Sequence, residues 1–291
     1  MLEKEPSRTA LTAAAYRAAH QVLEQDRIFE DPLAVPILGL DPELFRQDPE
    51  VHEAQRGMRF FVVARSNIAE SALTLGVEAR GLGQLVVLGA GLDTFAYRNP
   101  FGERLRVFEV DHPATQAWKR RRLAEAGIAV PDAFIYAPVD FEHENLSEQL
   151  AEAGLNPNVR TFFTWLGVVP YLTKEAIGST LSQIAAHPGG AEVVFDYGEP
   201  RERIDPALRT QYEERAARVA AAGEPFLSHF DPAELHEELR TLGFERIDDL
   251  DIPSILMRLL GGPADSVGVQ RVASARRSGG HVLFAATPVV S

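Results

Sequence analysis

Short apolar runs, each bounded by glycine or polar residues, recur along the middle of the chain. They lie at residues 84–89, 106–111, 134–139, 161–165 and 192–196. Runs of this length that are apolar almost throughout are typical of strands buried on both faces of a parallel sheet. The intervening segments at residues 113–126, 144–153 and 173–187 have helical patterns. This alternation predicts a doubly wound, Rossmann-like α/β fold.

The first eighty residues contain no such run and instead predict helices. Residues 9–25 are rich in alanine and other good helix formers, and residues 57–75 favour a second helix. Asp31-Pro32 and Asp41-Pro42 mark turns or helix starts. We therefore expect an N-terminal helical cap over residues 1–80 and one α/β domain over residues 81–291.

The last third of the chain departs from strict alternation. A charged helix is expected over residues 201–222, a second helix from Asp231-Pro232 to Gly243, and two final strands at 245–252 and 281–287. The glycine-rich segment 261–280 favours a loop. A mostly parallel sheet of seven strands, with the final strand inserted antiparallel and a helical lid around residues 200–228, accommodates these elements.

Composition and charge narrow the class of protein. The chain lacks cysteine, which excludes disulfides, thiolate metal sites and a cysteine nucleophile and fits the cytoplasm. Charged residues punctuate the first thirty positions, so we expect no export signal and no membrane anchor. A formal net charge of −13 opposes nucleic-acid binding, and the basic cluster 119–122 is expected on a solvated helix face.

A glycine-rich loop follows the first buried strand. In the segment Leu88-Gly-Ala-Gly-Leu-Asp-Thr94, Gly89 and Gly91 allow a sharp turn and close approach to a ligand, with Ala90 between them. This pattern predicts a nucleotide-binding loop. A dinucleotide fingerprint needs a third glycine where Thr94 stands, and Asp93 would repel a pyrophosphate but attract an ammonium group. The loop therefore favours S-adenosylmethionine over NAD, although a plain tight turn remains an alternative.

Acidic residues end the next two strands. Asp111 follows Gly91 by twenty residues, where a carboxylate can bind ribose hydroxyls, with His112 beside it. Glu109 faces the same side of the strand and is a competitor, but we prefer Asp111 because it lies nearer the strand tip. A helix N-cap is the alternative role for Asp111. Asp140 and Phe141 follow the third strand, where they could contact an adenine or, again, begin a helix.

Several longer segments resemble one protein family. They are LGAGLDTFAYR, FEVDHPATQAWKRRRL, PVDFE, WLGVVPYLTKEAI, the N-terminal RTALTAAAYRAAH and EDPLA, and FDPAELHEELRTLGF near the end. Together they resemble the leucine carboxyl methyltransferase family, which includes bacterial O-methyltransferases that act on polyketides such as tetracenomycin. The resemblance implies a class I methyltransferase fold with an N-terminal helical cap and S-adenosyl-L-methionine as methyl donor.

The resemblance also implies site residues. Arg65 matches an arginine that grips the cofactor carboxylate, and Arg17 matches a basic residue of the cap. Gly89, Asp111, Asp140 and Phe141 match cofactor positions. Trp165 and Leu166 stand at the end of the fourth strand, where many members have a glutamate in place of Leu166. The cofactor ammonium must therefore be held differently here, for instance by backbone carbonyls.

The acceptor is expected to be a small carboxylic acid or phenol, with polyketide-like molecules as examples. A carboxylate is already ionised near neutral pH and needs no general base, whereas a phenol would need one. Pocket candidates are Tyr171, Tyr197, Phe226 and His229, although aromatic residues at such positions more often pack the core. Serine hydrolase, P-loop and zinc-protease motifs are missing. A catalytically silent cofactor-binding protein and an NAD-dependent oxidoreductase remain the alternatives.

Overall fold

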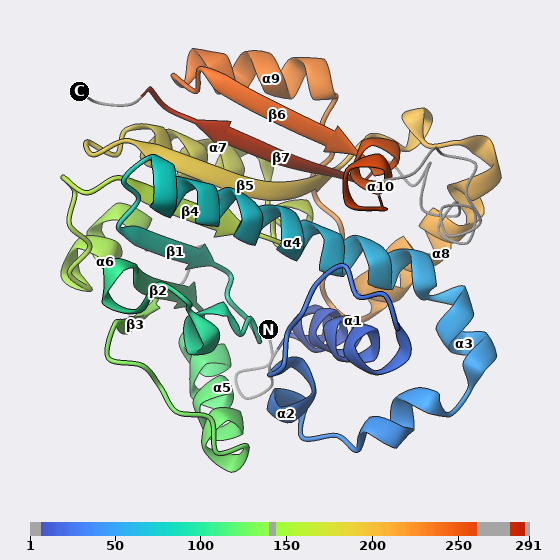
Figure 1. The fold of residues 1–291 in the computed structure, drawn as a ribbon. Coiled ribbons are helices and arrows are strands. Elements are labelled where there is room, and N and C mark those ends of the chain that lie inside the picture. Colours follow the sequence, from blue (N-terminus) through green and yellow to red (C-terminus); the bar gives the residue numbers. More distant parts are fainter. Residues whose placement is uncertain (1–6, 140–143, 261–279, 289–291) are drawn as a thin grey trace.

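The computed structural model describes residues 7–139, 144–260 and 280–288, and it shows a sheet flanked by helices (Figure 1). The strands are β1 Gln84–Leu88, β2 Arg106–Asp111, β3 Phe134–Pro138, β4 Thr161–Trp165, β5 Ala191–Gly198, β6 Arg246–Asp251 and β7 Gly280–Ala286. The helices are α1 Arg8–Leu23, α2 Ala34–Leu38, α3 Pro49–Ala54, α4 Arg56–Ala79, α5 Pro113–Glu125, α6 Leu146–Glu152, α7 Lys174–Ala185, α8 Arg209–Ala221, α9 Pro232–Thr241 and α10 Ile252–Leu260.

The strands form one seven-stranded sheet in the order β3-β2-β1-β4-β5-β7-β6. The first five strands are parallel, and β7 pairs antiparallel with both β5 and β6. This confirms the predicted α/β class, the number of strands and the antiparallel insertion of the last one. Because β1 to β5 are parallel, their carboxyl ends meet at one edge, where a doubly wound sheet binds its ligands.

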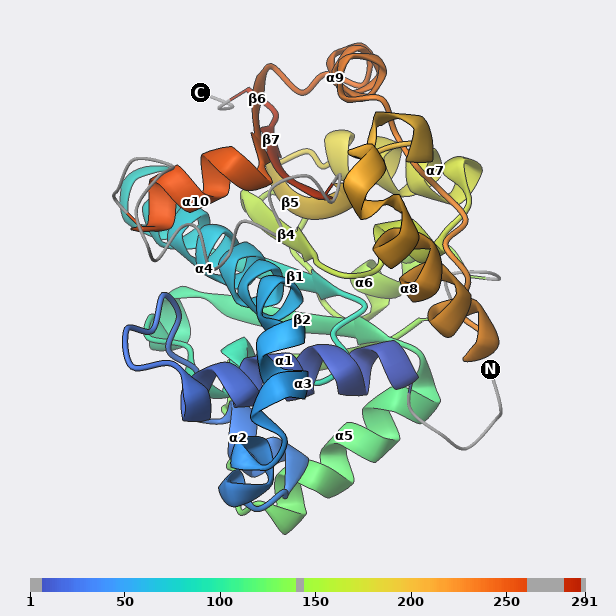
Figure 2. The same cartoon turned by 90° about the vertical axis from the view of Figure 1, so that its right-hand side faces the viewer.

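Two apolar cores lie on opposite faces of the sheet (Figure 2). On one face, Phe60, Ala64 and Leu73 of α4 pack with Ile255 of α10. On the other face, the core is completed by α6, α7 and α9. The central strands β1, β4 and β5 are thus covered on both sides, which explains why they read as nearly continuous apolar runs, whereas the edge strand β6 is only partly buried.

Polar caps start the helices at the ends of connecting loops. Asn145 accepts hydrogen bonds from the backbone at the start of α6, Thr173 does so at α7, and Asp231 at α9. These are the side chains that satisfy free N–H groups at a helix start. The predicted start at Asp231-Pro232 is therefore confirmed.

Two expectations for the last third need correction. The expected single helix over 201–222 is instead two 3-10 turns, Arg201–Arg203 and Pro206–Leu208, followed by α8. Pro206 explains the interruption, because a proline cannot donate the hydrogen bond that a continuous helix needs at this point. Helix α10 was not predicted at all. The predicted loop 261–280 lies almost entirely outside the described residues.

Helices α1, α2 and α3 lie together beside the sheet, at the edge where its parallel strands end (Figure 2). Ala14 of α1 packs with Ile37 of α2, Leu92 of the glycine loop and Leu123 of α5. Helix α4 belongs to the layer on the sheet instead. The division of the chain at residue 80 stays a prediction. Within the parts of the chain that the structure describes, no helix is long and apolar enough to cross a membrane.

A buried carboxylate lies at the amino-terminal end of β5. Glu192 of β5 is fully buried and accepts two hydrogen bonds of 2.7 Å from Arg80 and a longer one of 3.3 Å from Arg160. We expect Glu192→Ala to lower the free energy of unfolding by about 3 kcal/mol, because it leaves buried cations unpaired.

Urea unfolding followed by circular dichroism measures this loss. Glu213→Ala is the matched control, because Glu213 pairs with Arg201 where both side chains are half exposed. Such a pair contributes about 0–1 kcal/mol. Equal losses in the two variants would show that burial does not set the strength of the Glu192 cluster.

Candidate functional site

The glycine loop after β1 forms the centre of the candidate site. Gly89 and Gly91 have positive φ angles of 64° and 46°. A Cβ at Gly89 would lie 2.4 Å from Cγ2 of Val168, and one at Gly91 would lie 3.1 Å from Cβ of Ala10 in α1. The loop is therefore held between the segment after β4 and the N-terminal helix. Glycine is needed here for the turn and for this close packing, and Ala90 is buried.

Asp111 lies at the tip of β2 and ties this loop to the next. Its two carboxylate oxygens accept hydrogen bonds from the backbone N–H groups of Gly91, at 2.6 Å, and of His112, at 2.7 Å. Burial raises the pKa of Asp111, and these two hydrogen bonds oppose the shift. The residue that caps helix α5 is His112 and not Asp111: Nδ1 of His112 accepts a hydrogen bond from the N–H of Ala114. Asp111 therefore lies at the strand tip beside the glycine loop, and its contact with a cofactor stays a prediction.

The competitor Glu109 points into the protein instead. It is fully buried, and one carboxylate oxygen lies 2.7 Å from Nζ of Lys119. Burial raises the pKa of Glu109 to about 7, although the charge of Lys119 acts in the opposite direction. The expected solvated face of the basic cluster 119–122 is therefore wrong for Lys119, which is drawn inward by the buried carboxylate.

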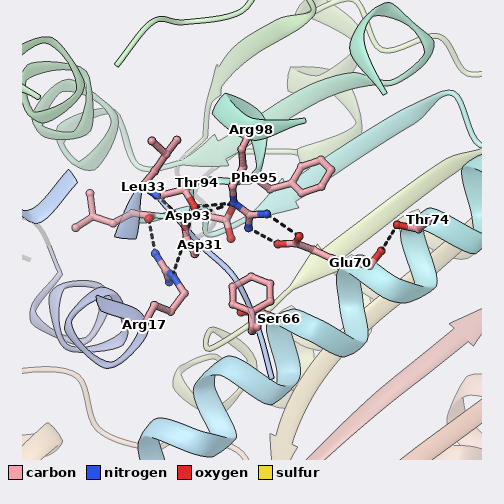
Figure 3. A network of polar contacts seen from close by, with 12 residues as sticks. Arg17, Asp31, Leu33, Ser66, Glu70, Thr74, Asp93, Thr94, Phe95 and Arg98 are labelled. Atoms are coloured by element: carbon pink, nitrogen blue, oxygen red, sulfur yellow. Dashed lines mark hydrogen bonds and ion pairs between the residues drawn. The ribbon is translucent and has the colours of Figure 1, made fainter. Parts of the chain in front are cut away.

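A polar network joins the cap to the glycine loop (Figure 3). Asp31 has a fully buried side chain that accepts a hydrogen bond of 2.7 Å from the hydroxyl of Thr94 and lies 3.4 Å from Nε of Arg17. Arg17 also donates to the carbonyl of Leu92, at 2.5 Å. Arg17 therefore holds the loop through its backbone, and its expected contact with a cofactor stays a prediction.

The network continues to the sheet side of the loop. Arg98 forms a bidentate ion pair with Glu70 of α4 and donates to the Thr94 hydroxyl at 3.2 Å (Figure 3). Asp93 accepts a hydrogen bond of 2.8 Å from the N–H of Phe95. A cavity of about 20 Å³, room for roughly one water molecule, lies between α4 and the strand tips and is lined by residues that include Glu70, Asp93 and Leu166.

Arg65 of α4 lies under the end of β4. Its Nη1 donates to Asp196 of β5 at 2.8 Å, and the other oxygen of Asp196 accepts from the N–H of Gly167 at 2.6 Å. A Cβ at Gly167 would lie 2.7 Å from Nη2 of Arg65. The arginine thus reaches the strand tips as the resemblance implies, but one edge of its guanidinium already binds a protein carboxylate.

Trp165, the last residue of β4, and Leu166, which follows it, point to opposite sides. Leu166 lines the small cavity beside Asp93, whereas Trp165 is fully buried in the core on the opposite face, with its ring 6.4 Å from that of Phe195. Trp165 therefore packs the core in this structure. Asp140 and Phe141, which were predicted at the adenine, lie outside the described residues.

The aromatic candidates divide into two groups. Tyr171 and Phe226 lie together, with ring centroids 5.4 Å apart, and His229 is hydrogen-bonded to the hydroxyl of Tyr212. Tyr197 is buried and donates instead to Asp249 of β6, at 2.6 Å. The structure thus brings three candidates together under α8 and places the fourth beside the antiparallel strands.

His281 stacks on Tyr197 and completes this second cluster. Its Nδ1 lies 3.1 Å from Asp249. Burial alone would lower the pKa of His281, but the hydrogen bond and charge of Asp249 outweigh it and raise the pKa. The protonated histidine therefore stabilises the fold fully below its ordinary pKa of 6.5, and this stabilisation is lost as the pH rises through the raised value.

We expect the free energy of unfolding to fall by about 1–2 kcal/mol through this pH window. The fall should disappear in His281→Gln and persist in His52→Gln, a histidine of α3 outside the cluster. Urea unfolding at a series of pH values measures both. An unchanged pH profile in His281→Gln would assign the dependence to other groups.

Three parts of the site were missed by sequence reasoning. They are the Asp31 network, the Arg65–Asp196 pair, and the position of Arg215 of α8, whose guanidinium lies over the ring of Phe226 and whose charge interacts with Tyr171. Each joins residues far apart in the chain, so no local pattern could reveal it. A separate cleft of about 1150 Å³ is lined by cap residues such as Glu24, Arg56 and Arg59. The glycine loop and Asp111 do not line it.

Solved structures place this fold in a known class. A provisionally assigned methyltransferase from Thermobifida fusca superposes with a TM-score of 0.57 over 98% of this chain and 96% of that one, at 15% identity. A DUF574 family protein from Streptomyces avermitilis gives a TM-score of 0.54, covers 94% and 97% of the two chains, and is also 15% identical. The fold is that of the class I methyltransferases.

Sequence relatives define the family. The family model for leucine carboxyl methyltransferases matches residues 10–185. YktD of Bacillus subtilis, provisionally named an S-adenosyl-L-methionine-dependent methyltransferase, is 32% identical over 280 residues, covering 87% of this chain and 91% of YktD. A similarly named relative from Mycobacterium avium is 28% identical and covers 77% and 73% of the chains. The chain belongs to the leucine carboxyl methyltransferase family, a family of S-adenosyl-L-methionine-dependent enzymes.

Proposed function

We propose that this protein transfers a methyl group from S-adenosyl-L-methionine to an oxygen atom of a small-molecule acceptor, with a carboxylate as the preferred group. The observation that carries the proposal is the position of Asp111. Its carboxylate bridges the glycine loop and the start of α5 at the tips of β1 and β2. Each oxygen accepts one backbone hydrogen bond, and the hydroxyl of Thr115 is a third donor to the carboxylate, which leaves one of its four lone-pair positions for a ribose hydroxyl.

The residues around Asp111 fit the rest of the cofactor. Gly89 and Gly91 let the loop turn tightly between Val168 and Ala10, which sets its backbone at the strand tips where the cofactor would bind. Arg65 has donors beyond the one bound to Asp196, because a guanidinium carries five N–H groups, and these could bind the cofactor carboxylate. Leu166 offers no acceptor for the ammonium group. Asp93 and the backbone carbonyls of the loop are the acceptors that we assign to it.

Methyl transfer to a carboxylate requires few catalytic groups from the protein. The bound cofactor supplies an electrophilic methyl group on a sulfonium. An acceptor oxygen forms a bond to the methyl carbon as the carbon–sulfur bond breaks, and the electron pair stays on sulfur. The protein holds the two reactants in line and excludes water. An ionised carboxylate needs no base at neutral pH.

A hydroxyl acceptor is the second candidate, and one observation favours it. Burial lowers the pKa of His229, so this histidine is neutral near pH 7 and can accept a proton. It lies beside Tyr212 in the aromatic group under α8. The aromatic rings favour an apolar, polyketide-like acceptor for either reaction.

Calorimetric titration with S-adenosyl-L-methionine and separately with NAD tests the cofactor. We expect saturable binding of the first alone, weakened in Arg65→Ala. Binding of NAD, or of neither ligand, would overturn the proposal. Binding without turnover against a broad panel of acids and phenols would indicate a silent cofactor-binding protein.

The type of product distinguishes the two acceptors. With a methyl-labelled cofactor, a methyl ester releases volatile labelled methanol in mild base, whereas a methyl ether does not. We expect release of labelled methanol. A product stable to base would assign the reaction to a hydroxyl and direct attention to His229.

A further inference from the structure

Arg215 differs from the other buried arginines of the protein. It projects from α8 and is only partly exposed. Carboxylates lie within ion-pair distance of the well-buried arginines elsewhere, as in Arg17–Asp31, Arg59–Glu24, Arg65–Asp196 and Arg160–Glu192. Among the residues that the structure describes, Arg215 has no ion pair and no hydrogen bond. Burial lowers the pKa of its guanidinium, which is the cost of desolvating an unpaired cation.

The surroundings of Arg215 belong to the candidate site. Its guanidinium carbon lies 5.3 Å from the ring centroid of Phe226, and that ring lies 5.4 Å from Tyr171. The charge of Arg215 also interacts with Tyr16 of α1 and with Asp196 at the end of β5. Elements from three parts of the chain therefore converge on this cation.

The nearby carboxylates are already engaged. Asp196 is bound by Arg65 and by the N–H of Gly167. Glu224, three residues after the end of α8, accepts a hydrogen bond of 3.1 Å from the N–H of Thr9. Among the described residues, no carboxylate lies within ion-pair distance of Arg215, so the donors of its guanidinium are available to an anionic ligand.

From this geometry we infer that Arg215 is a specificity-determining residue, which binds an anionic group of the acceptor from the lid side of the site. A planar guanidinium beside aromatic rings fits a carboxylate carried on an apolar or aromatic body. The inference rests on the proposed function, since it concerns the acceptor of that same site.

The alternative is that Arg215 only packs against Phe226. The two roles differ in their effect on stability. Arg215→Met removes an unpaired, partly desolvated cation, so a ligand-binding role predicts a melting temperature that is unchanged or higher. A structural role predicts a lower one.

Ligand binding gives the decisive test. Wild type and variants are saturated with S-adenosylhomocysteine and titrated calorimetrically with aromatic carboxylates such as 1-naphthoate, each paired with its neutral primary amide. We expect wild type to bind acids at least about tenfold more tightly than amides, as for charge-assisted hydrogen bonds. Arg215→Met should lose this preference, and Arg215→Lys should keep part of it. Arg218→Met, an exposed position of the same helix, is the control.

The outcomes separate the two proposals. No acid preference in wild type, or a preference that persists in Arg215→Met, would overturn the role of Arg215. The first step of the titration, binding of S-adenosylhomocysteine, tests the cofactor independently. If that ligand fails to bind, the proposed function is wrong, whereas normal cofactor binding without acid preference rejects the Arg215 inference alone.

Discussion

Asp31→Ala is expected to lower the free energy of unfolding by about 3–5 kcal/mol, the range for removal of one partner from a buried ionic cluster. The carboxylate of Asp31 has no exposed surface and lies among Arg17, Arg98 and the hydroxyl of Thr94. Its loss leaves Arg17 buried with the carbonyl of Leu92 as its remaining hydrogen-bond acceptor. Urea unfolding followed by circular dichroism measures the change.

The matched control is Asp41→Ala. Asp41 also precedes a proline and also accepts a backbone hydrogen bond two residues on, from Glu43, but it is exposed. Loss of such a cap costs about 1 kcal/mol. If the two variants lose the same stability, Asp31 acts as a turn residue and the network in Figure 3 contributes little.

Asp111→Asn is expected to weaken binding of S-adenosylhomocysteine by about 100-fold, or about 3 kcal/mol. Both oxygens of Asp111 accept backbone N–H groups, from Gly91 and His112. An amide nitrogen in place of either oxygen would face a donor, so the loop and the ribose contact are both disturbed. Calorimetric titration measures the loss, and Asp132→Asn, an exposed acid before β3, serves as control.

A deoxy cofactor separates the ribose contact from the disturbance of the loop. Wild type should bind the 2′-deoxy analogue of S-adenosylhomocysteine more weakly than the parent compound, whereas Asp111→Asn should bind the two about equally. An equal preference for the parent compound in both proteins would show that Asp111 supports the loop without contacting the ribose.

Much of the fold could be predicted because its signals are local. A strand covered on both faces must be apolar along its whole length, so β1 and β4 stand out as short runs. The residues of the glycine loop could be predicted for the same reason. Once the strands are located, their carboxyl ends are known, and these ends carry Gly89, Gly91 and Asp111. Asp111 was preferred over Glu109 because it lies nearer the strand tip, and the structure adds that Glu109 is bound by Lys119.

The remaining features depend on contacts between distant segments. Arg65 was expected to face a ligand, and no pattern near it reveals Asp196, which lies 131 residues away in sequence. Asp31 was expected to be a turn residue, although it is also the buried centre of an ionic cluster. Helix α10 follows β6 directly. Its start signals are Asp251, which accepts a hydrogen bond from the N–H of Ser254, and Pro253 in the first turn, and they were missed because they overlap the end of the strand predicted at 245–252.

The position of β7 has a consequence for how the chain folds during synthesis. Strands β5 and β6 are made before β7, yet each pairs with β7 and not with the other. Until residue 286 leaves the ribosome, the edge of β5 that faces away from β4 has no neighbouring strand, and β6 has no strand with which to pair. The nascent protein thus carries an open strand edge over the whole interval, the kind of surface on which incomplete chains aggregate and which chaperones protect.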